Sequence, residues 1–494
     1  MARKFRVPGF SGLLRAAWLL PLILAQSPLA EAQVSLPNVR LPNLSGNALG
    51  LPLNTDRTLS GLSSDLDLRR LHILDLIHKN PKEIEADPNG APILRGEVVA
   101  FSPSDEALEK ARAAGFTVLR DRALDGLDAR LVVLKVPAGT ATHRALKQLK
   151  ALDPQGAYDF NHIYTDSGEV VGADSAAAGE AARGETEAVA PTAGATASGS
   201  GAAAGPSGTK VGLIDGGVDV SHAVFRDIAI HQHGCSGTAV PAAHGTAVAS
   251  LMIGRSPRFH GAAPGSELYA ADVYCGLPTG GAVDAVGEAF AWLVREHVPV
   301  INVSLVGPPN VMLENVVRMV IARGHVVVAA VGNDGPAAPP LYPASYPDVV
   351  GVTAVDARRR VLLEACRGRQ VKFSAPGADM SAANPAQSFA LVRGTSFASP
   401  IVAGLLAEAV HEPDADAARR AVADLAGRAI DLGAPGLDPV YGYGLVGEDL
   451  RPEISLARGS GGADGSGSAS GGTGAGGVSG HGGGGGGLSV GGQD

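Results

Sequence analysis

The chain has 494 residues, of which 45% are hydrophobic and 18% are charged, and its formal net charge is -9. This length is enough for two or three domains with a sizeable core. An acidic chain offers no basic surface field for nucleic acid, so a nucleic-acid-binding function is not expected. Three cysteines, Cys235, Cys275 and Cys366, allow at most one bridge within the chain and leave one thiol over.

The N-terminus, residues 1–32, has the features of a secretory signal peptide. Basic residues precede the apolar run from Ala16 to Ala25, and Ala30-Glu31-Ala32 fits a small-x-small cleavage site. The apolar run is too short to span a bilayer comfortably, although an uncleaved anchor is the alternative. We therefore predict a secreted or periplasmic protein. No later segment is long and apolar enough for a stable membrane span.

Two regions follow. Residues 33–94 form an N-terminal segment with one predicted helix, from Asp65 to Asn80, where apolar residues recur at helical spacing. Residues 95–165 predict a small α+β domain in the order strand, helix, strand, strand, helix, strand, which is the ferredoxin-like arrangement. These elements are expected at 97–101, 104–115, 116–119, 129–136, 142–152 and 157–164.

A change in amino-acid composition separates a linker from a large domain. Residues 166–208 are mostly Ala, Gly, Ser and Thr with scattered Glu, which predicts a disordered linker. In residues 209–456, near-continuous apolar strands alternate with helices, which predicts an α/β fold with a parallel sheet covered on both faces. Strands are expected at 210–214, 227–232, 267–273, 298–303, 326–331 and 349–355, and helices at 283–296 and 312–323. Residues 457–494 are nearly all Gly and Ser, and a disordered tail is expected.

The stretch from Arg393 to Gly404 predicts a tight glycine turn that opens directly into an apolar helix, with Ser396 at its N-terminus. Unpaired N–H groups and the helix dipole favour negative charge there, so a serine nucleophile and the oxyanion it creates would both benefit. A plain N-cap serine is the alternative. Asp215 and His244 argue against that alternative. Each stands upstream in its own glycine-flanked turn, and Asp215 ends a strand, where sites of parallel sheets form.

Four motifs lie along the large domain in the order Asp215-Gly216-Gly217, His244-Gly245-Thr246, Gly332-Asn333 and Gly394-Thr395-Ser396-Phe397-Ala398-Ser399-Pro400. Together they resemble the motifs of the subtilisin-like serine proteases, over about residues 209–447. The resemblance implies a subtilisin-like fold and hydrolysis of peptide bonds through an acyl-enzyme. The Asp-His-Ser order differs from those of chymotrypsin-like and α/β-hydrolase enzymes, and Ser396 lacks the Gly-x-Ser-x-Gly elbow of the latter.

By this resemblance Ser396 is the nucleophile, His244 the general base and Asp215 the residue that orients it. Asn333 and the backbone N–H of Ser396 would hold the oxyanion. Asp219 is a competing aspartate and Asn302 a competing asparagine. Two positions depart from the family pattern, because Gly216 stands where Ser or Thr is usual and Ala247 where a second His is usual. Of the two departures, only the loss of the hydroxyl at 216 bears on the site, because it removes a possible hydrogen bond near Asp215 without changing the role of Asp215.

The partners implied are peptide or protein substrates. The segment from Ile301 to Leu305 resembles the one that pairs with an extended substrate through backbone hydrogen bonds. The substrate-binding residues implied are Ser304, Leu305, Val306, Gly307, Ala330 and Gly332. Leu341 falls where the family often has glycine and would fill the primary pocket. We therefore expect small or medium apolar residues before the scissile bond.

The domain at 95–165 lies between a signal peptide and a protease domain, and so resembles a propeptide. Its end, from Asp159 to Tyr164, resembles the tail with which such propeptides occupy the active-site cleft. This implies an autoinhibited precursor in which the propeptide is an intramolecular inhibitor and is removed by the enzyme's own site. An ordinary accessory domain is the alternative. For the whole chain, the alternative is a catalytically inactive binding protein with the same fold.

No cofactor or metal is predicted. His231 and His233 share one face of a strand, but no third ligand is apparent. Residues 254–261, where many relatives bind calcium, contain two arginines and no Asp, Asn or Glu, so we expect no calcium there. The implied topology makes the strands before Cys235 and Cys275 neighbours about 4.8 Å apart, which predicts a disulfide between them and leaves Cys366 as the odd thiol.

Overall fold

The computed structural model describes residues 68–171, 208–385 and 387–455. The predicted signal peptide, the glycine-rich tail and most of the predicted linker lie outside the described residues. Among the described helices, none has the length and apolar character needed to cross a membrane.

The first part of the described chain is helix α1 (Leu68–Lys79) followed by a small domain that we call the N-terminal domain (residues 84–162). Its elements are β1 (Ile84–Ala86), β2 (Pro92–Phe101), α2 (Asp105–Ala113), β3 (Thr117–Leu124), β4 (Ala129–Lys135), α3 (Thr142–Leu152) and β5 (Ala157–His162). β2 lies between β4 and β5, and β3 lies outside β4, all antiparallel. This is the order predicted from the sequence, although β1 was not predicted and lies before the expected start of the domain at residue 95.

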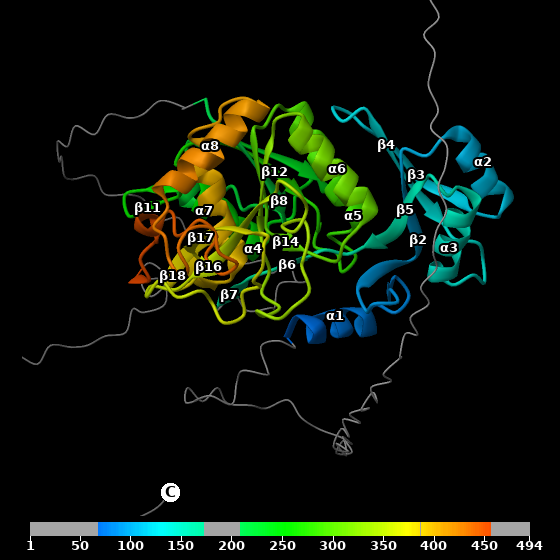
Figure 1. The fold of residues 1–494 in the computed structure, drawn as a ribbon, viewed down its shortest axis with the longest axis horizontal. Coiled ribbons are helices and arrows are strands. Elements are labelled where there is room, and N and C mark those ends of the chain that lie inside the picture. The colour runs from blue at the N-terminus through cyan, green and yellow to red at the C-terminus, as the bar shows by residue number, and fades with distance from the viewer. Residues whose placement is uncertain (1–67, 172–207, 386, 456–494) are drawn as a thin grey trace, which may run out of the picture. The chain divides into compact units, whose positions relative to one another are not determined.

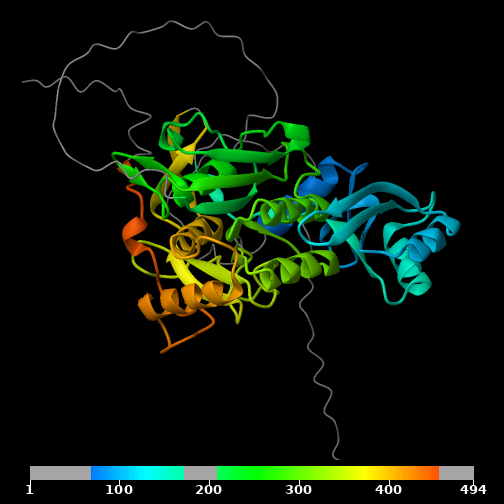
Figure 2. The same cartoon turned by 90° about the horizontal axis from the view of Figure 1, so that it is seen from above.

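The two faces of the N-terminal sheet have different partners. Helices α2 and α3 cover one face, where Leu108 and Leu146 pack against Val98 and Val132. The other face carries Val99, Leu131 and Val133, which belong to the same buried cluster as helix residues of the large domain. The N-terminal domain therefore buries an apolar face against the large domain. Figures 1 and 2 draw the two helices of the N-terminal domain on one face of its sheet.

The large domain (residues 208–455) is built on a seven-stranded sheet in which every pairing is parallel (Figure 1). The strands in sheet order are β17 (Val371–Pro376), β16 (Val350–Val355), β15 (Val326–Ala330), β13 (Val300–Val303), β8 (Lys210–Asp215), β12 (Glu267–Asp272) and β9 (Ile230–Gly234). Helices α4 (Ala243–Ile253) and α7 (Thr395–Ala407) pack on one face, and α5 (Val283–Arg295) and α6 (Val311–Ala322) on the other. The predicted fold class is confirmed.

Several elements differ from the prediction. Strand β9 begins three residues later than expected, because Asp227 has a left-handed backbone (φ 61°) that cannot belong to a strand. Helix α8 (Ala415–Arg428), strand β17 and the hairpin of β18 (Met380–Asn384) and β19 (Ser388–Arg393) were not predicted. Residues 254–261 contain a short hairpin of β10 (Arg255–Ser256) and β11 (Phe259–His260).

The predicted disulfide is present. Strands β9 and β12 are parallel neighbours, with Leu268 opposite Ile230, and Cys235 and Cys275 follow them. The two cysteines are bonded, with their Cα atoms 5.2 Å apart. Cys366 is buried and free, as predicted for the odd thiol, and burial raises the pKa of its thiol to about 12.

The start of the predicted linker is ordered, which corrects the expectation of a disordered segment from residue 166. Strand β6 (Thr165–Asp166) pairs antiparallel with β14 (Leu305–Val306), and β7 (Glu169–Val171) pairs antiparallel with β19. We call residues 164–171 the bound segment. The composition of these residues gives no strand signal, so the pairing with two strands of the large domain determines their conformation.

Candidate active site

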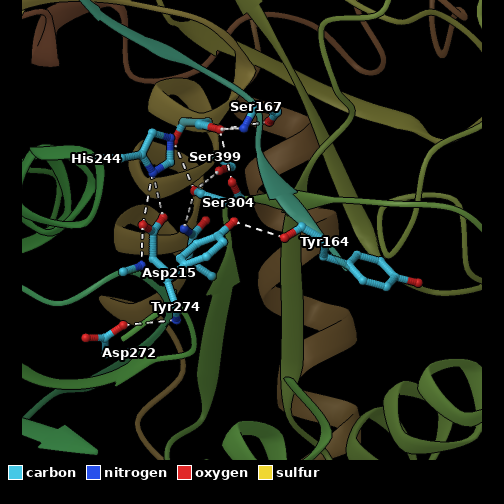
Figure 3. Close-up of polar contacts among 11 residues, drawn as sticks. Tyr164, Ser167, Asp215, His244, Asp272, Tyr274, Ser304 and Ser399 are labelled. Atoms are coloured by element: carbon cyan, nitrogen blue, oxygen red, sulfur yellow. Dashed lines mark hydrogen bonds and ion pairs between the residues drawn. The ribbon is translucent and has the colours of Figure 1, made fainter. Parts of the chain in front are cut away.

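Asp215 and His244 form a buried pair at the carboxyl end of the parallel sheet (Figure 3). Asp215 is the last residue of β8 and is fully buried, and His244 is the second residue of α4. His244 Nδ1 lies 2.9 and 3.0 Å from the two carboxylate oxygens of Asp215. The backbone N–H of Gly216 also donates to Asp215 Oδ1, at 2.6 Å. The ring of His244 is therefore fixed in orientation by the carboxylate.

The electrostatics of this pair favour a charged imidazole. Burial lowers the pKa of His244, but the charge and hydrogen bond of Asp215, together with the charge of Asp166, outweigh burial and raise that pKa to about 9. Full burial raises the pKa of Asp215, although His244 and the N–H of Gly216 act in the opposite direction. For the pair we hold to the rise at His244, because a carboxylate in contact with an imidazole stabilises the imidazolium form.

The turn before α7 places Ser396 at the start of that helix. Gly394 has φ 137°, and a Cβ at this position would lie 2.7 Å from the Cα of Gly168 and 2.8 Å from Asn333 Nδ2. Only glycine therefore allows the bound segment to approach so closely. Thr395 Oγ1 accepts a hydrogen bond from the N–H of Gly332 at 3.1 Å, which ties this turn to the loop after β15.

A proline in α7 explains why Ser304 lies beside Ser396. Pro400 has no N–H, so the carbonyl of Ser396, four residues earlier, lacks its usual helical donor. The hydroxyl of Ser304 donates to that carbonyl at 3.0 Å instead. In return, Ser396 Oγ donates to the carbonyl of Ser304 at 3.1 Å. Asn302 Nδ2 supports Ser304 Oγ at 2.8 Å, so this asparagine belongs to the scaffold beneath the serine.

Ser396 Oγ makes its other contacts with the bound segment and not with His244. The backbone N–H of Ser167 donates to Ser396 Oγ at 3.1 Å, and the two serine hydroxyls are 2.7 Å apart (Figure 3). Within the described residues, His244 Nε2 is buried and has no hydrogen-bond partner. The ring of His244 packs against Phe397, the next residue after Ser396, with centroids 5.3 Å apart. His244 therefore packs against the residue that follows the serine, and it forms no hydrogen bond with Ser396 among the described residues.

Asn333 directs its amide at the bound segment. Asn333 Oδ1 accepts from the N–H of Thr395 at 3.2 Å, which orients the side chain. Asn333 Nδ2 donates to the carbonyl oxygen of Ser167, and the N–H of Ser396 lies 3.4 Å from the same oxygen. Two donors therefore converge on one carbonyl oxygen, in the arrangement that an oxyanion hole requires.

Comparison with known proteins places this arrangement in a family. The subtilase family model, peptidase S8, matches residues 206–444. The chain is 30% identical over 208 residues to the minor extracellular protease Epr of Bacillus subtilis (strain 168), covering 41% of this chain and 32% of that protein. It is 32% identical over 244 residues to subtilisin BL of Lederbergia lenta, covering 49% of this chain and 89% of the relative. The chain belongs to the subtilase family.

A solved structure agrees on the fold of this subtilase. Fervidolysin from Fervidobacterium pennivorans, described as a keratinolytic enzyme related to subtilisin, aligns with a TM-score of 0.57 and 21% identity. The alignment covers 72% of this chain and 61% of that one. The family membership confirms the predicted enzyme class, a serine endopeptidase.

The remaining predicted residues of this subtilase fall into two groups. Leu305 and Val306 form the strand β14 that pairs with the bound segment, and Gly307 lies against the ring of Tyr164. Ser304, Ala330 and Gly332 are buried beneath the site. The competing Asp219 accepts hydrogen bonds from the N–H and the hydroxyl of Ser221, and it is not the partner of His244 Nδ1. His231 is paired with Glu267, and His233 stacks on Trp292.

One correction concerns the tail of the N-terminal domain, and one residue near the cleft was not predicted. Residues Asp159 to His162, predicted to lie in the cleft, form β5 of the N-terminal sheet, and only Tyr164 of the predicted tail belongs to the bound segment. Sequence reasoning also missed Arg69 of α1. Arg69 Nη1 pairs with Asp334 Oδ2 at 2.8 Å, Nε donates to Thr165 Oγ1 at 3.3 Å, and Nη2 lies 3.4 Å from the carbonyl of Val306. Only the fold brings α1 to the cleft, so no local pattern could reveal this role.

Proposed function

We propose that this chain is an exported serine endopeptidase made as an autoinhibited precursor, in which Asp215, His244 and Ser396 are the catalytic triad. Ser396 Oγ attacks the carbonyl carbon of a peptide bond while His244 Nε2 takes its proton. Asp215 holds the ring and stabilises the imidazolium that forms. Asn333 Nδ2 and the N–H of Ser396 stabilise the oxyanion of the tetrahedral intermediate.

One observation carries this proposal. The carbonyl of Ser167 accepts from both Asn333 Nδ2 and the N–H of Ser396, while the N–H of Ser167 donates to Ser396 Oγ. A peptide bond of the chain itself thus occupies the place of a substrate. The unpartnered Nε2 of His244 supports the role of base, since no other described group occupies this nitrogen, which can take the proton of Ser396 once the imidazole is neutral. The N-terminal domain would then be the propeptide that inhibits the enzyme, because its last strand leads directly into the bound segment.

Labelling with a fluorophosphonate probe tests the proposal against the alternative of an inactive binding protein. We expect the processed protein to be labelled at Ser396 and the Ser396→Ala variant to remain unlabelled. Ser374→Ala is a matched control, because Ser374 is also fully buried and lies in β17, away from the bound segment. Failure of the folded protein to react with the probe, tested after an added protease has cut the bound segment, would support the inactive binding protein instead.

A further inference from the structure

The bound segment crosses the site as an extended strand with one peptide bond at the nucleophile. Before that bond, Thr165 and Asp166 pair with Val306 and Leu305, and after it, Glu169 to Val171 pair with Arg393 to Leu391. The single carbonyl that receives the two oxyanion donors is that of Ser167. We propose that the chain cleaves itself between Ser167 and Gly168, an assignment that rests on the proposed function and identifies its first substrate.

The cleavage is an acyl transfer to serine followed by hydrolysis. Ser396 Oγ bonds to the carbonyl carbon of Ser167, and its proton passes to His244 Nε2. The bond from this carbon to the nitrogen of Gly168 breaks, and His244 returns the proton to that nitrogen. Water then attacks the ester, leaving a proton on His244 that goes back to Ser396 Oγ. The products are a carboxylate at Ser167 and an amine at Gly168.

Tyr164 is the anchor on the side before the cleaved bond. Its side chain is fully buried, and its hydroxyl donates to the carbonyl of Pro308 at 2.6 Å. The hydroxyl of Tyr274 donates to the backbone carbonyl of Tyr164 at 3.2 Å (Figure 3). A Cβ at Gly307 would lie 2.6 Å from the tyrosine ring, so the ring occupies space that only glycine leaves open. The pocket thus selects a large aromatic residue three positions before Ser167.

Small residues are required on both sides of the cleaved bond. Leu341 is buried against Gly332, where a Cβ would lie 2.4 Å from Leu341 Cδ1, so this leucine fills space behind the oxyanion loop. Ser167 is correspondingly small and is buried. A Cβ at Gly168 would lie 2.5 Å from the ring of Phe397, which favours glycine directly after the bond. The substrate class that this site takes is therefore an extended peptide with an aromatic residue, two residues that pair with β14, a small residue and then glycine.

Refolding of the full chain from denaturant, quenched at intervals, identifies the first bond cut. Intact mass and N-terminal sequencing should show a first fragment that begins at Gly168, formed at a rate independent of protein concentration. Gly168→Pro should block this cut, because the proline ring would meet Phe397, whereas Gly179→Pro, beyond the paired segment, should be cut normally. A first cut at another bond that still requires Ser396 would overturn this assignment and leave the proposed function standing. No Ser396-dependent cut at all would overturn both.

A double-mutant cycle tests the anchor. Tyr164→Ala and Gly307→Ala should each slow the first cut, by roughly ten- to hundredfold for the loss of a buried aromatic side chain. If the ring and the glycine act through one contact, adding Gly307→Ala to the Tyr164→Ala chain should cause little further loss. A general loss of folding would instead make the two effects additive, and additive effects would rule out the pocket as the determinant of specificity.

Discussion

The two halves of the bound segment are held very differently. Before the Ser167–Gly168 bond, the segment has a fully buried tyrosine and a threonine held by Arg69, and it continues into β5 of a folded domain. After the bond, Glu169 is exposed and Val170 is half-buried, although Glu169 to Val171 pair with β19. Cleavage would therefore separate a strongly anchored fragment from a weakly anchored one. We infer that the first half stays in the cleft as an inhibitor and that the second half leaves.

The anchoring of the first half extends well beyond the cleft. Asp159 Oδ2 accepts from the N–H of Val311, the first residue of α6, at 2.8 Å, where a carboxylate is favoured by the helix dipole. Arg120 of β3 pairs with Asp284 in the first turn of α5 at 2.8 Å, and with Glu97 of its own domain. These polar contacts surround the apolar face shared by the two domains, so the N-terminal fragment would keep many contacts after the bond is cut.

The largest expected effect is that of Ser396→Ala, which should keep the two halves joined. Without the nucleophile neither the cut after Ser167 nor hydrolysis of an added peptide should be detectable. Intact mass of the purified precursor measures the first and a fluorogenic peptide the second. Ser374→Ala should be processed normally. Full maturation of the Ser396→Ala chain in a host lacking other proteases would contradict self-processing.

Asn333→Ala should slow the separation of the halves while leaving the strand pairing on either side of the bond in place. Removing one oxyanion donor from a subtilisin costs about 10²–10³ in turnover, and we expect a loss of the same order here because the same amide group serves the same oxygen. The same quenched refolding series gives the rate of the first cut. Loss of less than about tenfold would mean that Asn333 Nδ2 contributes little to the oxyanion, and that the N–H of Ser396 carries most of it.

These contrasts show what sequence could and could not predict. Strands β8, β12, β15 and β16 were placed within one or two residues, because long runs of buried apolar side chains are a strong local signal. Strand β9 was misplaced because its polar residues, His231 to His233, give no such run. The short strand β18 and the half-exposed β19 were missed for the same reason.

The site divides in the same way. Asp215, His244, Asn333 and Ser396 stand in motifs that resemble those of the family, so the resemblance predicted that they lie together, and the structure pairs His244 with Asp215 and Asn333 with Thr395. The pairing of the bound segment did not, because its partners Leu305 and Leu391 lie more than a hundred residues further along the chain. Arg69 and Tyr274 reach the segment from α1 and from the loop after β12. Such contacts depend on the assembled fold and leave no mark in local composition.

A smaller effect is expected when Arg69 is changed, because its side chain is only about four-fifths buried and its ion pair with Asp334 is partly screened. Arg69→Met removes the contacts with Asp334, Thr165 and Val306 but keeps the apolar stem. After the cut, the N-terminal fragment should leave up to about tenfold faster, which shortens the lag before an added peptide is hydrolysed. The neighbouring Arg70→Met is the control, because Arg70 is exposed. An equal change in both variants would remove Arg69 from the anchor.

The smallest expected effect is a shift in the pH dependence of the first cut, and it distinguishes the halves by charge. His244 must be neutral to accept the proton of Ser396, so the rate should rise with pH as the imidazolium loses its proton. Asp166 lies before the cleaved bond, and its charge contributes to the raised pKa of His244. Asp166→Asn removes that charge and destabilises the imidazolium, so the pKa of His244 falls and the rise should begin at lower pH. The side chain of Asp166 is exposed, so we expect a shift of only about a few tenths of a pH unit at low ionic strength, shrinking as salt is added.

Glu169→Gln makes the same charge change after the bond, where it does not contribute to the pKa of His244, and it should leave the profile in place. A shift to higher pH in Asp166→Asn, or equal shifts in both variants, would show that the charge of the first half does not act on the base.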